Sequence, residues 1–274
     1  MHKTILITGA TDGIGLETAK LLVDLGHRVL VHGRNEQKLT RVVDELSRRP
    51  GSTSVENFVA DLSDFSQVEA LASAVLGSQE SLDVLINNAG VYATSSPRTK
   101  SGLDVRFAVN TIAPYLLTNR LLPILPAHGR IVNLSSAAQS PVDLEALDGT
   151  RHLDDGMAYA QSKLGITMWT NYLAREIGSA GPAVIAVNPG SLLATKMVKD
   201  AYDVTGSDIR IGADILRRAA LDEEFASASG LYYDNDSRRF APPHPDALDE
   251  AKCAEVARSI ESVLRPDRRD EESR

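Results

Sequence analysis

Short runs of aliphatic residues alternate with longer amphipathic stretches from the start of the chain almost to its end. The runs cover residues 4–8, 28–32, 55–59, 82–87, 130–134, 183–188 and 230–234. Such alternation is typical of parallel strands joined by crossover helices. The segment Val84-Leu85-Ile86 is apolar at consecutive positions, which predicts burial of its strand on both faces. We therefore expect an α/β fold, a doubly wound parallel sheet of about seven strands with helices on both faces.

The first helix is expected to begin near Gly13 and to stop at Gly26, because glycine is a common C-terminal cap. No internal repeat and no linker rich in Pro, Gly or Ser divides the chain, so a single domain over residues 1–265 is predicted. Residues 266–274 are charged at almost every position, and we expect them to form a disordered tail. Residues 139–156 form a polar stretch that is long for a connection between a strand and a helix.

The composition of the chain restricts the partners that it can bind and the cellular compartment in which we expect it. With 43% hydrophobic and 24% charged residues, the 274-residue chain resembles a soluble globular protein. A net charge of -8 disfavours binding to nucleic acid. The single cysteine, Cys253, cannot form an intrachain disulfide, so a reducing, cytoplasmic location is expected. The first three residues lead directly into an apolar strand, and the six histidines lack HxH or HExxH spacing. We therefore expect no membrane anchor and no metal site.

A glycine-rich turn lies between the first predicted strand and the first predicted helix. Its candidate cofactor-binding residues are Gly9, Thr11, Asp12, Gly13, Ile14 and Gly15. Glycine lets the backbone approach phosphate groups, and the unpaired amides at a helix start offer hydrogen bonds and positive potential. The same pattern could be an ordinary turn of an α/β protein, but its place in the chain favours binding of a dinucleotide.

Tyr159 and Lys163 are four residues apart, so on a helix both side chains lie on one face. A phenol with a pKa near 10 is a poor proton shuttle at neutral pH, but a neighbouring ammonium favours the phenolate. The pair can therefore serve as a general acid/base. The alternative is a half-buried tyrosine beside a solvated lysine. The pair follows a strand that ends in Ser135-Ser136, which favours the catalytic interpretation.

The glycine spacing GxxxGxG after Thr8 and the YxxxK pair, taken in order along the chain, resemble the short-chain dehydrogenase/reductase family. The long separation between Ser136 and Tyr159 resembles its retinol-dehydrogenase-like branch. The resemblance covers residues 4–195 motif by motif and implies a single-domain Rossmann fold, a nicotinamide dinucleotide and hydride transfer.

The resemblance also implies roles for individual residues. Lys163 would hold the nicotinamide ribose, Ser136 rather than Ser135 would bond the substrate oxygen, and Asn110 would keep a water in line with the lysine, although it could equally stabilise only a helix kink. The remaining cofactor-binding candidates follow the third, fourth and sixth strands: Asp61 and Leu62; Asn88, Ala89 and Gly90; Pro189, Gly190 and Thr195. Thr195 stands one residue farther from Gly190 than the usual PGxxxT spacing.

The second strand ends Val31-His32-Gly33-Arg34, with no acidic residue to accept hydrogen bonds from an adenine ribose. Arg34 instead offers a permanently charged fork to a phosphate, and Asn35 follows it. We therefore expect NADP, with NAD less favoured. Alternatively, Arg34 only caps or solvates the start of the next helix.

These observations predict an NADP-dependent oxidoreductase that acts on a small-molecule carbonyl or alcohol. Three alternatives stay open: reduction of an activated carbon-carbon double bond, a non-catalytic dinucleotide-binding redox sensor, and a sugar epimerase or dehydratase, for which little chain remains after Thr195. Tyr92, residues 139–156 and an apolar lid over residues 192–202, with Leu192, Leu193, Met197 and Tyr202, are expected to choose the substrate. The family often pairs helices that would here run near residues 111–125 and 159–177, which favours a homodimer or homotetramer, although the family also contains monomers.

Overall fold

The computed structural model describes residues 2–195 and 206–265, and eight strands within them form one sheet. The strands are β1 (Thr4–Ile7), β2 (Arg28–Gly33), β3 (Ser54–Val59), β4 (Val84–Asn87), β5 (Arg130–Leu134), β6 (Ala183–Asn188), β7 (Tyr232–Asp234) and β8 (Arg239–Ala241). Their order across the sheet is β3-β2-β1-β4-β5-β6-β7-β8. Neighbours from β3 to β7 pair in parallel, so the doubly wound α/β fold is confirmed.

The sheet differs from the expectation at its edge. Each of the seven expected strands is present, with bounds shifted by one or two residues where they differ. The eighth strand, β8, pairs antiparallel with β7 and was not expected. It has only three residues, reads Arg-Phe-Ala and runs into Pro242-Pro243, so it shows no periodic pattern.

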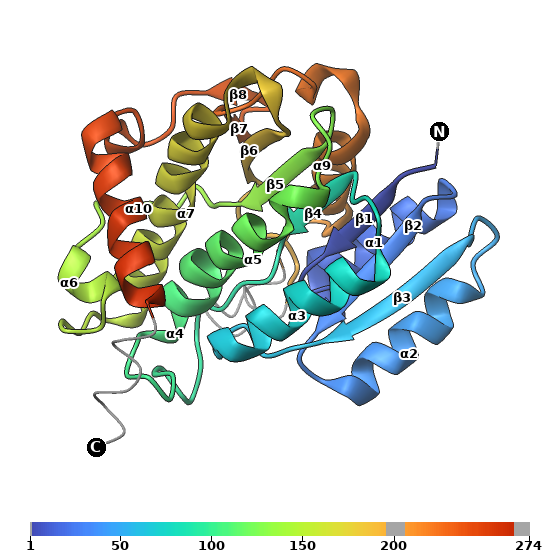
Figure 1. Cartoon of the computed structure of the whole chain (residues 1–274), viewed down its shortest axis with the longest axis horizontal. Helices are drawn as coiled ribbons and strands as arrows, with labels where there is room; N and C mark the ends of the chain where they lie inside the picture. The colour runs from blue at the N-terminus through green and yellow to red at the C-terminus, as the bar shows by residue number, and fades with distance from the viewer. Residues whose placement is uncertain (1, 196–205, 266–274) are drawn as a thin grey trace.

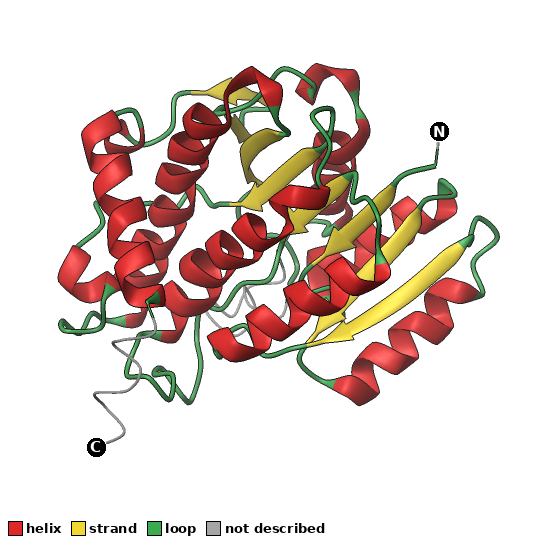
Figure 2. Ribbon diagram, viewed as in Figure 1, coloured by secondary structure: helices red, strands yellow, loops and turns green. Residues whose placement is uncertain are grey.

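Helices cover both faces of the sheet (Figure 1). One layer contains α3 (Phe65–Ser78), α5 (Ala113–Leu121) and α7 (Asp155–Ile177), and the other contains α1 (Gly13–Asp24), α2 (Glu36–Ser47) and α9 (Arg210–Leu221). Figure 2 shows the strands between these layers. Successive residues of a strand enter opposite cores: Leu6 packs in the first layer's core, while Ile5 and Ile7 pack in the second. This burial on both faces explains why the strands are continuously apolar.

The remaining described elements are short, apart from the last helix. They are α4 (Val105–Phe107), a π-helical turn (Ala108–Ile112), α6 (Leu144–Leu147), α10 (Glu250–Leu264) and the 3₁₀ turns Leu122–Ile124, Gly178–Ala180, Glu223–Phe225 and Pro245–Ala247. Residues 139–156 are thus not a plain loop, since they contain α6 and the first two residues of α7. Within the described part of the chain, no helix combines the length and apolar character that a membrane span requires. The expected tail, residues 266–274, lies outside the described residues.

The last helix, α10, packs alongside α7 (Figure 1). It buries Cys253, Val256 and Ile260 in the core beneath it. Tyr115 of α5 donates a hydrogen bond of 2.8 Å to the carboxylate of Glu261 on α10. Subunits that paired through α5 and α7 would therefore meet α10 as well.

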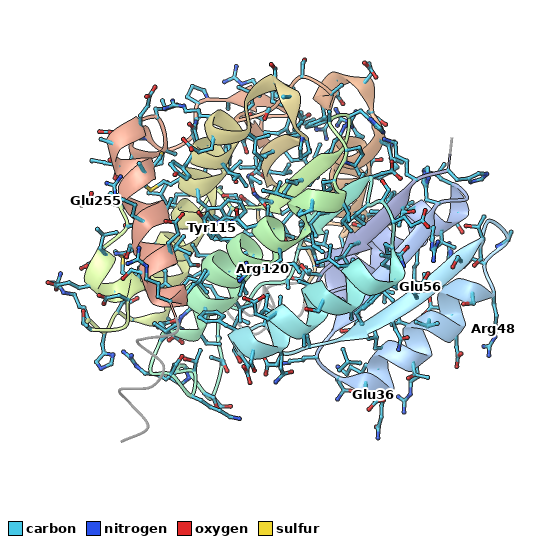
Figure 3. The ribbon with its side chains drawn as sticks, in the orientation of Figure 1. Glu36, Arg48, Glu56, Tyr115, Arg120 and Glu255 are labelled. Carbon is cyan, nitrogen blue, oxygen red and sulfur yellow. The ribbon has the colours of Figure 1, made fainter. Side chains whose placement is uncertain are left out.

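Replacement of Ile260 by alanine tests how firmly α10 is anchored. The side chain is fully buried, so we expect the free energy of unfolding to fall by about 2–5 kcal/mol in urea denaturation. Glu255 lies exposed on the same helix (Figure 3), and Glu255→Ala is the matched control, expected to change stability by less than about 0.5 kcal/mol. Equal effects of the two substitutions would contradict this packing.

Candidate active site

A cleft of about 780 Å³ lies at the carboxyl ends of the parallel strands. This is where ligands bind in open α/β sheets. The structure brings most of the predicted site residues to its walls: Gly9, Thr11, Asp12, Gly13, Ile14, Arg34, Asn35, Asp61, Leu62, Asn88, Ala89, Gly90, Ser136, Tyr159, Lys163, Pro189, Gly190 and Thr195. Two predicted residues, Gly15 and Asn110, do not line the cleft.

The glycine-rich turn is shaped by close backbone contacts. Gly9 has a φ of +66°, and a Cβ atom there would lie 2.8 Å from Cα of Ala89. A Cβ atom on Gly15 would lie 2.4 Å from both Nδ2 of Asn88 and the carbonyl oxygen of Gly9. Gly15 therefore supports the turn from behind and lets α1 begin close to it. Asp12 caps the helix, accepting a 2.8 Å hydrogen bond from the Gly13 amide.

The segment after β4 is fastened to this turn. The Thr8 hydroxyl oxygen accepts hydrogen bonds of 3.1 Å from the backbone amides of Asn88 and Ala89. The side-chain amide of Asn88 donates to the carbonyl oxygens of Thr8, at 2.9 Å, and Gly9, at 3.0 Å. Donors and acceptors on both segments are thereby satisfied, which fixes the floor of the cleft.

Two cationic side chains line the end of the cleft beside β2. Among the described residues, the exposed Arg34 side chain has no hydrogen-bond or ion-pair partner, and Lys38 lies one helical turn farther on α2. The start of α2 is capped by Asn35, whose side-chain oxygen accepts a 2.9 Å hydrogen bond from the Lys38 amide. Capping is thus done by Asn35 and not by Arg34. Near them the Asp61 carboxylate accepts hydrogen bonds from Ser63, whose amide and hydroxyl lie at 2.9 and 2.8 Å.

Both serines after β5 line the cleft, but their hydroxyl groups differ in burial and in hydrogen bonding. Ser135 is 2% exposed, and its hydroxyl bonds the Lys163 carbonyl oxygen at 3.1 Å and the Thr167 hydroxyl at 2.7 Å. Ser136 is half-buried and lines the cleft, and its hydroxyl oxygen accepts a 3.1 Å hydrogen bond from the Ala138 amide. The greater exposure of Ser136 favours it as the serine that reaches a bound molecule, and this role stays a prediction.

Tyr159 and Lys163 lie one turn apart on α7 and line the same cleft. The Lys163 ammonium is 5.7 Å from the centre of the Tyr159 ring and donates a 2.7 Å hydrogen bond to the Leu134 carbonyl oxygen at the end of β5. Complete burial lowers the pKa of Lys163 to about 8. An ammonium that still carries its charge at neutral pH thus lies beside the phenol.

Tyr92 and a buried ion pair set the position of the Tyr159 ring. The rings of Tyr92 and Tyr159 meet edge to face with centres 4.9 Å apart. The Arg106 guanidinium, 1% exposed, pairs with Asp104 at 2.7 Å and with Asp155, the first residue of α7, at 2.5 Å. It also donates to the Tyr92 carbonyl oxygen at 3.2 Å. One arginine therefore connects the segment after β4 to the start of the tyrosine helix.

Comparison with known proteins identifies the family. A family model described as short chain dehydrogenase matches residues 3–205. The chain belongs to this family. Curated relatives include human retinol dehydrogenase 13, which is 31% identical over 94% of this chain and 82% of its own length. Human retinol dehydrogenase 11 is 37% identical over 69% of this chain and 61% of its own length. The similarity to the retinol-dehydrogenase-like branch is thereby confirmed.

Solved structures share the fold over most of the chain. A short chain dehydrogenase from Burkholderia cenocepacia J2315 in complex with NADP has a TM-score of 0.69 and 27% identity, and the match covers 85% of this chain and 95% of that one. A metagenomic short-chain oxidoreductase in complex with NADP has a TM-score of 0.62 and 31% identity, covering 80% of this chain and 90% of that one.

This short-chain dehydrogenase holds Asn110 away from the cleft wall. Asn110 is 1% exposed and lies in the π-helical turn before α5. Its side-chain oxygen accepts a 2.8 Å hydrogen bond from the Val91 amide, and its NH₂ donates to the Val91 carbonyl oxygen and to Ser162, both at 2.9 Å. These contacts support the helix-kink interpretation, and a role in proton transfer stays a prediction.

The segment after β6 is held by the turn between β7 and β8. The Asn188 side chain donates to Asp234 at 2.8 Å and to Asp236 at 2.9 Å, and the Ser191 hydroxyl donates to Asp236 at 2.6 Å. Thr195 lines the cleft opposite the start of α1, with its methyl group 3.9 Å from where a Cβ atom of Gly13 would lie. Met197 and Tyr202 of the expected lid lie outside the described residues.

Sequence reasoning misjudged parts of the lining. Tyr92, Leu192 and Leu193 line the cleft as expected, but no residue of 139–156 does. That stretch instead buries Ala146 and Leu147 in the core, and its Arg151 pairs with Asp143 and Glu145. His32 and Lys38 line the cleft and were missed, although their places at and just after the end of β2 were the available signal. Within the described ranges no cluster of three acidic, histidine or cysteine side chains could hold a metal ion.

The burial of Lys163 predicts a pH-dependent contribution to stability. Its pKa is about 8 in the folded protein and returns toward 10.5 on unfolding. Below about pH 8 both states carry the charge, and the folded state bears the cost of burying it. Between these two values the folded lysine has lost its proton and the unfolded one has not, so stability should rise with pH.

The test compares the melting temperatures of wild-type protein and Lys163→Met across this pH window. The wild type should gain stability relative to the variant as the pH rises through it. The exposed Lys100→Met is the control and should follow the wild type. A constant difference between wild type and Lys163→Met would contradict the burial argument.

Proposed function

We propose that this short-chain dehydrogenase is an NADP-dependent oxidoreductase that transfers a hydride between nicotinamide C4 and a carbonyl or alcohol substrate, with Tyr159 as general acid/base. One observation carries the proposal: Tyr159 and Lys163 line the same cleft as the glycine-rich turn. The side chains suited to proton transfer and the backbone suited to binding phosphate therefore line the same cleft.

The residues of the cleft fit a dinucleotide phosphate. Of the described residues, only Thr195 comes within 4 Å of the position of a Cβ atom on Gly13, through its methyl group. Gly13 opens α1, and backbone amides at a helix start attract anions. The unpartnered Arg34 and the neighbouring Lys38 supply positive charge for a ribose 2′-phosphate. The Burkholderia and metagenomic structures, solved with NADP, support the same cofactor over NAD.

Each reacting side chain has a distinct task in this proposal. The nicotinamide would supply or accept the hydride when bound. Tyr159 would protonate the substrate oxygen in reduction and remove its proton in oxidation. Lys163, charged at neutral pH, would favour the phenolate and hold the ribose hydroxyls. Ser136 would donate a hydrogen bond to the substrate oxygen. Asn110 acts in this scheme through Ser162, whose hydroxyl donates to the Tyr159 carbonyl oxygen at 2.7 Å.

The substrate is proposed to be a small molecule with an apolar body. The cleft lining includes Val91, Tyr92, Leu192 and Leu193. The relatives named retinol dehydrogenase, together with human polyprenol dehydrogenase, carry the names of apolar alcohols. A homodimer or homotetramer and a cytoplasmic location remain predictions. A carbonyl, alcohol and enone panel read by nicotinamide absorbance would separate carbonyl reduction from double-bond reduction and from a redox sensor without turnover.

Replacement of Tyr159 by phenylalanine tests the proton-transfer role. We expect NADP binding to persist, because the ring and its contact with Tyr92 remain, while turnover falls by at least about 100-fold. Binding is measured by nicotinamide fluorescence and turnover by nicotinamide absorbance on the best substrate of the panel. Tyr172→Phe, on the same helix and outside the cleft, is the control. Full activity of Tyr159→Phe would refute the role.

Replacement of Arg34 by aspartate tests the choice of cofactor. We expect the affinity for NADP relative to NAD to fall by about tenfold or more, because a charge-assisted hydrogen bond is replaced by repulsion. Fluorescence titrations with both cofactors measure the ratio. Arg41→Asp makes the same charge change on the exposed side of α2 and should leave the ratio near that of the wild type. An unchanged ratio in Arg34→Asp would show the assignment to be wrong.

A further inference from the structure

His32 lies where three strands end. It is the penultimate residue of β2 and is 2% exposed. Its Nδ1 accepts a 3.2 Å hydrogen bond from the Gly9 amide, in the glycine-rich turn after β1. Its Nε2 lies 3.0 Å from the carbonyl oxygen of Ala60, after β3. The His32 carbonyl oxygen accepts a 2.9 Å hydrogen bond from the Ala10 amide. A single residue thus bonds to the segments that follow both neighbouring strands, β1 and β3.

The two ring contacts dictate the protonation state of the imidazole. The Gly9 amide can only donate, so Nδ1 carries no proton, and the Ala60 carbonyl can only accept, so Nε2 carries one. The ring is therefore neutral and in a single tautomer. Burial supports this state, since it lowers the pKa of His32 to about 4. Protonation of Nδ1 would set two donors against each other at the turn.

The hydrogen bond between His32 and Gly9 holds the part of the turn that would contact the cofactor. Gly9 adopts a positive φ of +66° and lies against Ala89, so its peptide has to be held in a conformation that few residues adopt. Both the Gly9 and the Ala10 amide are bound by His32. We propose that His32 is a positioning residue that holds the glycine-rich turn in the conformation that binds the dinucleotide. The ligand part of this proposal rests on the proposed function, and the ordering of the turn does not.

Two substitutions separate the two ring contacts. The side-chain oxygen of asparagine occupies the place of Nδ1, so His32→Asn retains an acceptor for Gly9 and loses the bond to Ala60. The terminal amide of glutamine reaches the place of Nε2, so His32→Gln retains the bond to Ala60 and loses the one to Gly9. A merely structural role in joining strands would make the two variants equivalent in cofactor binding.

His27→Gln is the matched control. His27 is also a buried histidine beside β2, 8% exposed, and its Nδ1 also accepts a backbone hydrogen bond, from the Lys3 amide at 3.1 Å. It precedes β2, at the end of the strand away from the cleft, and does not line the cleft. His27→Gln therefore also removes a buried imidazole, as His32→Gln does, but leaves the glycine-rich turn unchanged.

The experiment measures the NADP Kd by fluorescence, the melting temperature, and amide hydrogen exchange of the peptide that contains Gly9 and Ala10. His32→Gln should raise Kd about tenfold and speed exchange in the turn, because preorganisation is lost. His32→Asn and His27→Gln should keep Kd near the wild-type value even where their melting temperatures fall.

A His32→Gln protein that binds NADP as the wild type does would overturn the proposal, and so would equal losses in His32→Asn and His32→Gln. Wild-type protein that binds no dinucleotide would instead overturn the proposed function. In that case hydrogen exchange decides the rest: faster exchange only in His32→Gln supports the ordering of the turn by His32, and unchanged exchange refutes it.

Discussion

The contact between the glycine-rich turn and the segment after β4 is the interaction on which the site depends. β1 and β4 are neighbours where the chain reverses its direction of progress across the sheet, and their loops therefore diverge to opposite sides. A cleft opens between such loops, and it keeps its shape only if they are tied together. Thr8 and Asn88 hold the two loops together. The Asn88 backbone amide donates to the Thr8 hydroxyl oxygen, and the Asn88 side chain donates to the Thr8 carbonyl oxygen. These bonds fix the positions of the cleft-lining residues in the glycine-rich turn and in the segment after β4 relative to each other.

The part of the cleft that contains Tyr159 and Lys163 lowers the stability of the fold. Complete burial of the Lys163 ammonium disfavours its charge, and the Leu134 carbonyl offers only partial compensation. The buried Arg106 is compensated more fully, since it has two carboxylates and a carbonyl within reach. The contrast is informative. The Arg106 charge, which holds elements together, is neutralised by carboxylates, while among the described residues no carboxylate pairs with the Lys163 charge beside Tyr159.

Sequence patterns identified the features that have a local physical signature. Continuous aliphatic runs mark strands that are buried on both faces, and Tyr159 and Lys163 share a helix face by spacing alone. Features that depend on contacts distant in sequence were missed or misjudged. Asn110 bonds Ser162, the neighbour of Lys163, but its bonds to Val91 join it to another loop and could not be read from the sequence. His32 was passed over because its bonds to Gly9 and Ala60 exist only once three strands align. The choice of Ser136 over Ser135 came from the family resemblance, and the buried contacts of Ser135 now give its physical reason.

The unexpected strand β8 shows how an inconspicuous element can shape a site. It has only three residues, of which Phe240 packs against Phe225 and Tyr233, and its pairing with β7 creates the turn at Asp234 and Asp236. Partial burial would raise the pKa of Asp236, but hydrogen bonds from Ser191 and Asn188 outweigh it and hold that pKa below its ordinary value. An ionised carboxylate at the turn therefore accepts hydrogen bonds from the segment that follows β6. Because β6 ends at Asn188, the hydrogen bonds to this turn at the edge of the sheet are what hold Ser191 just beyond the strand.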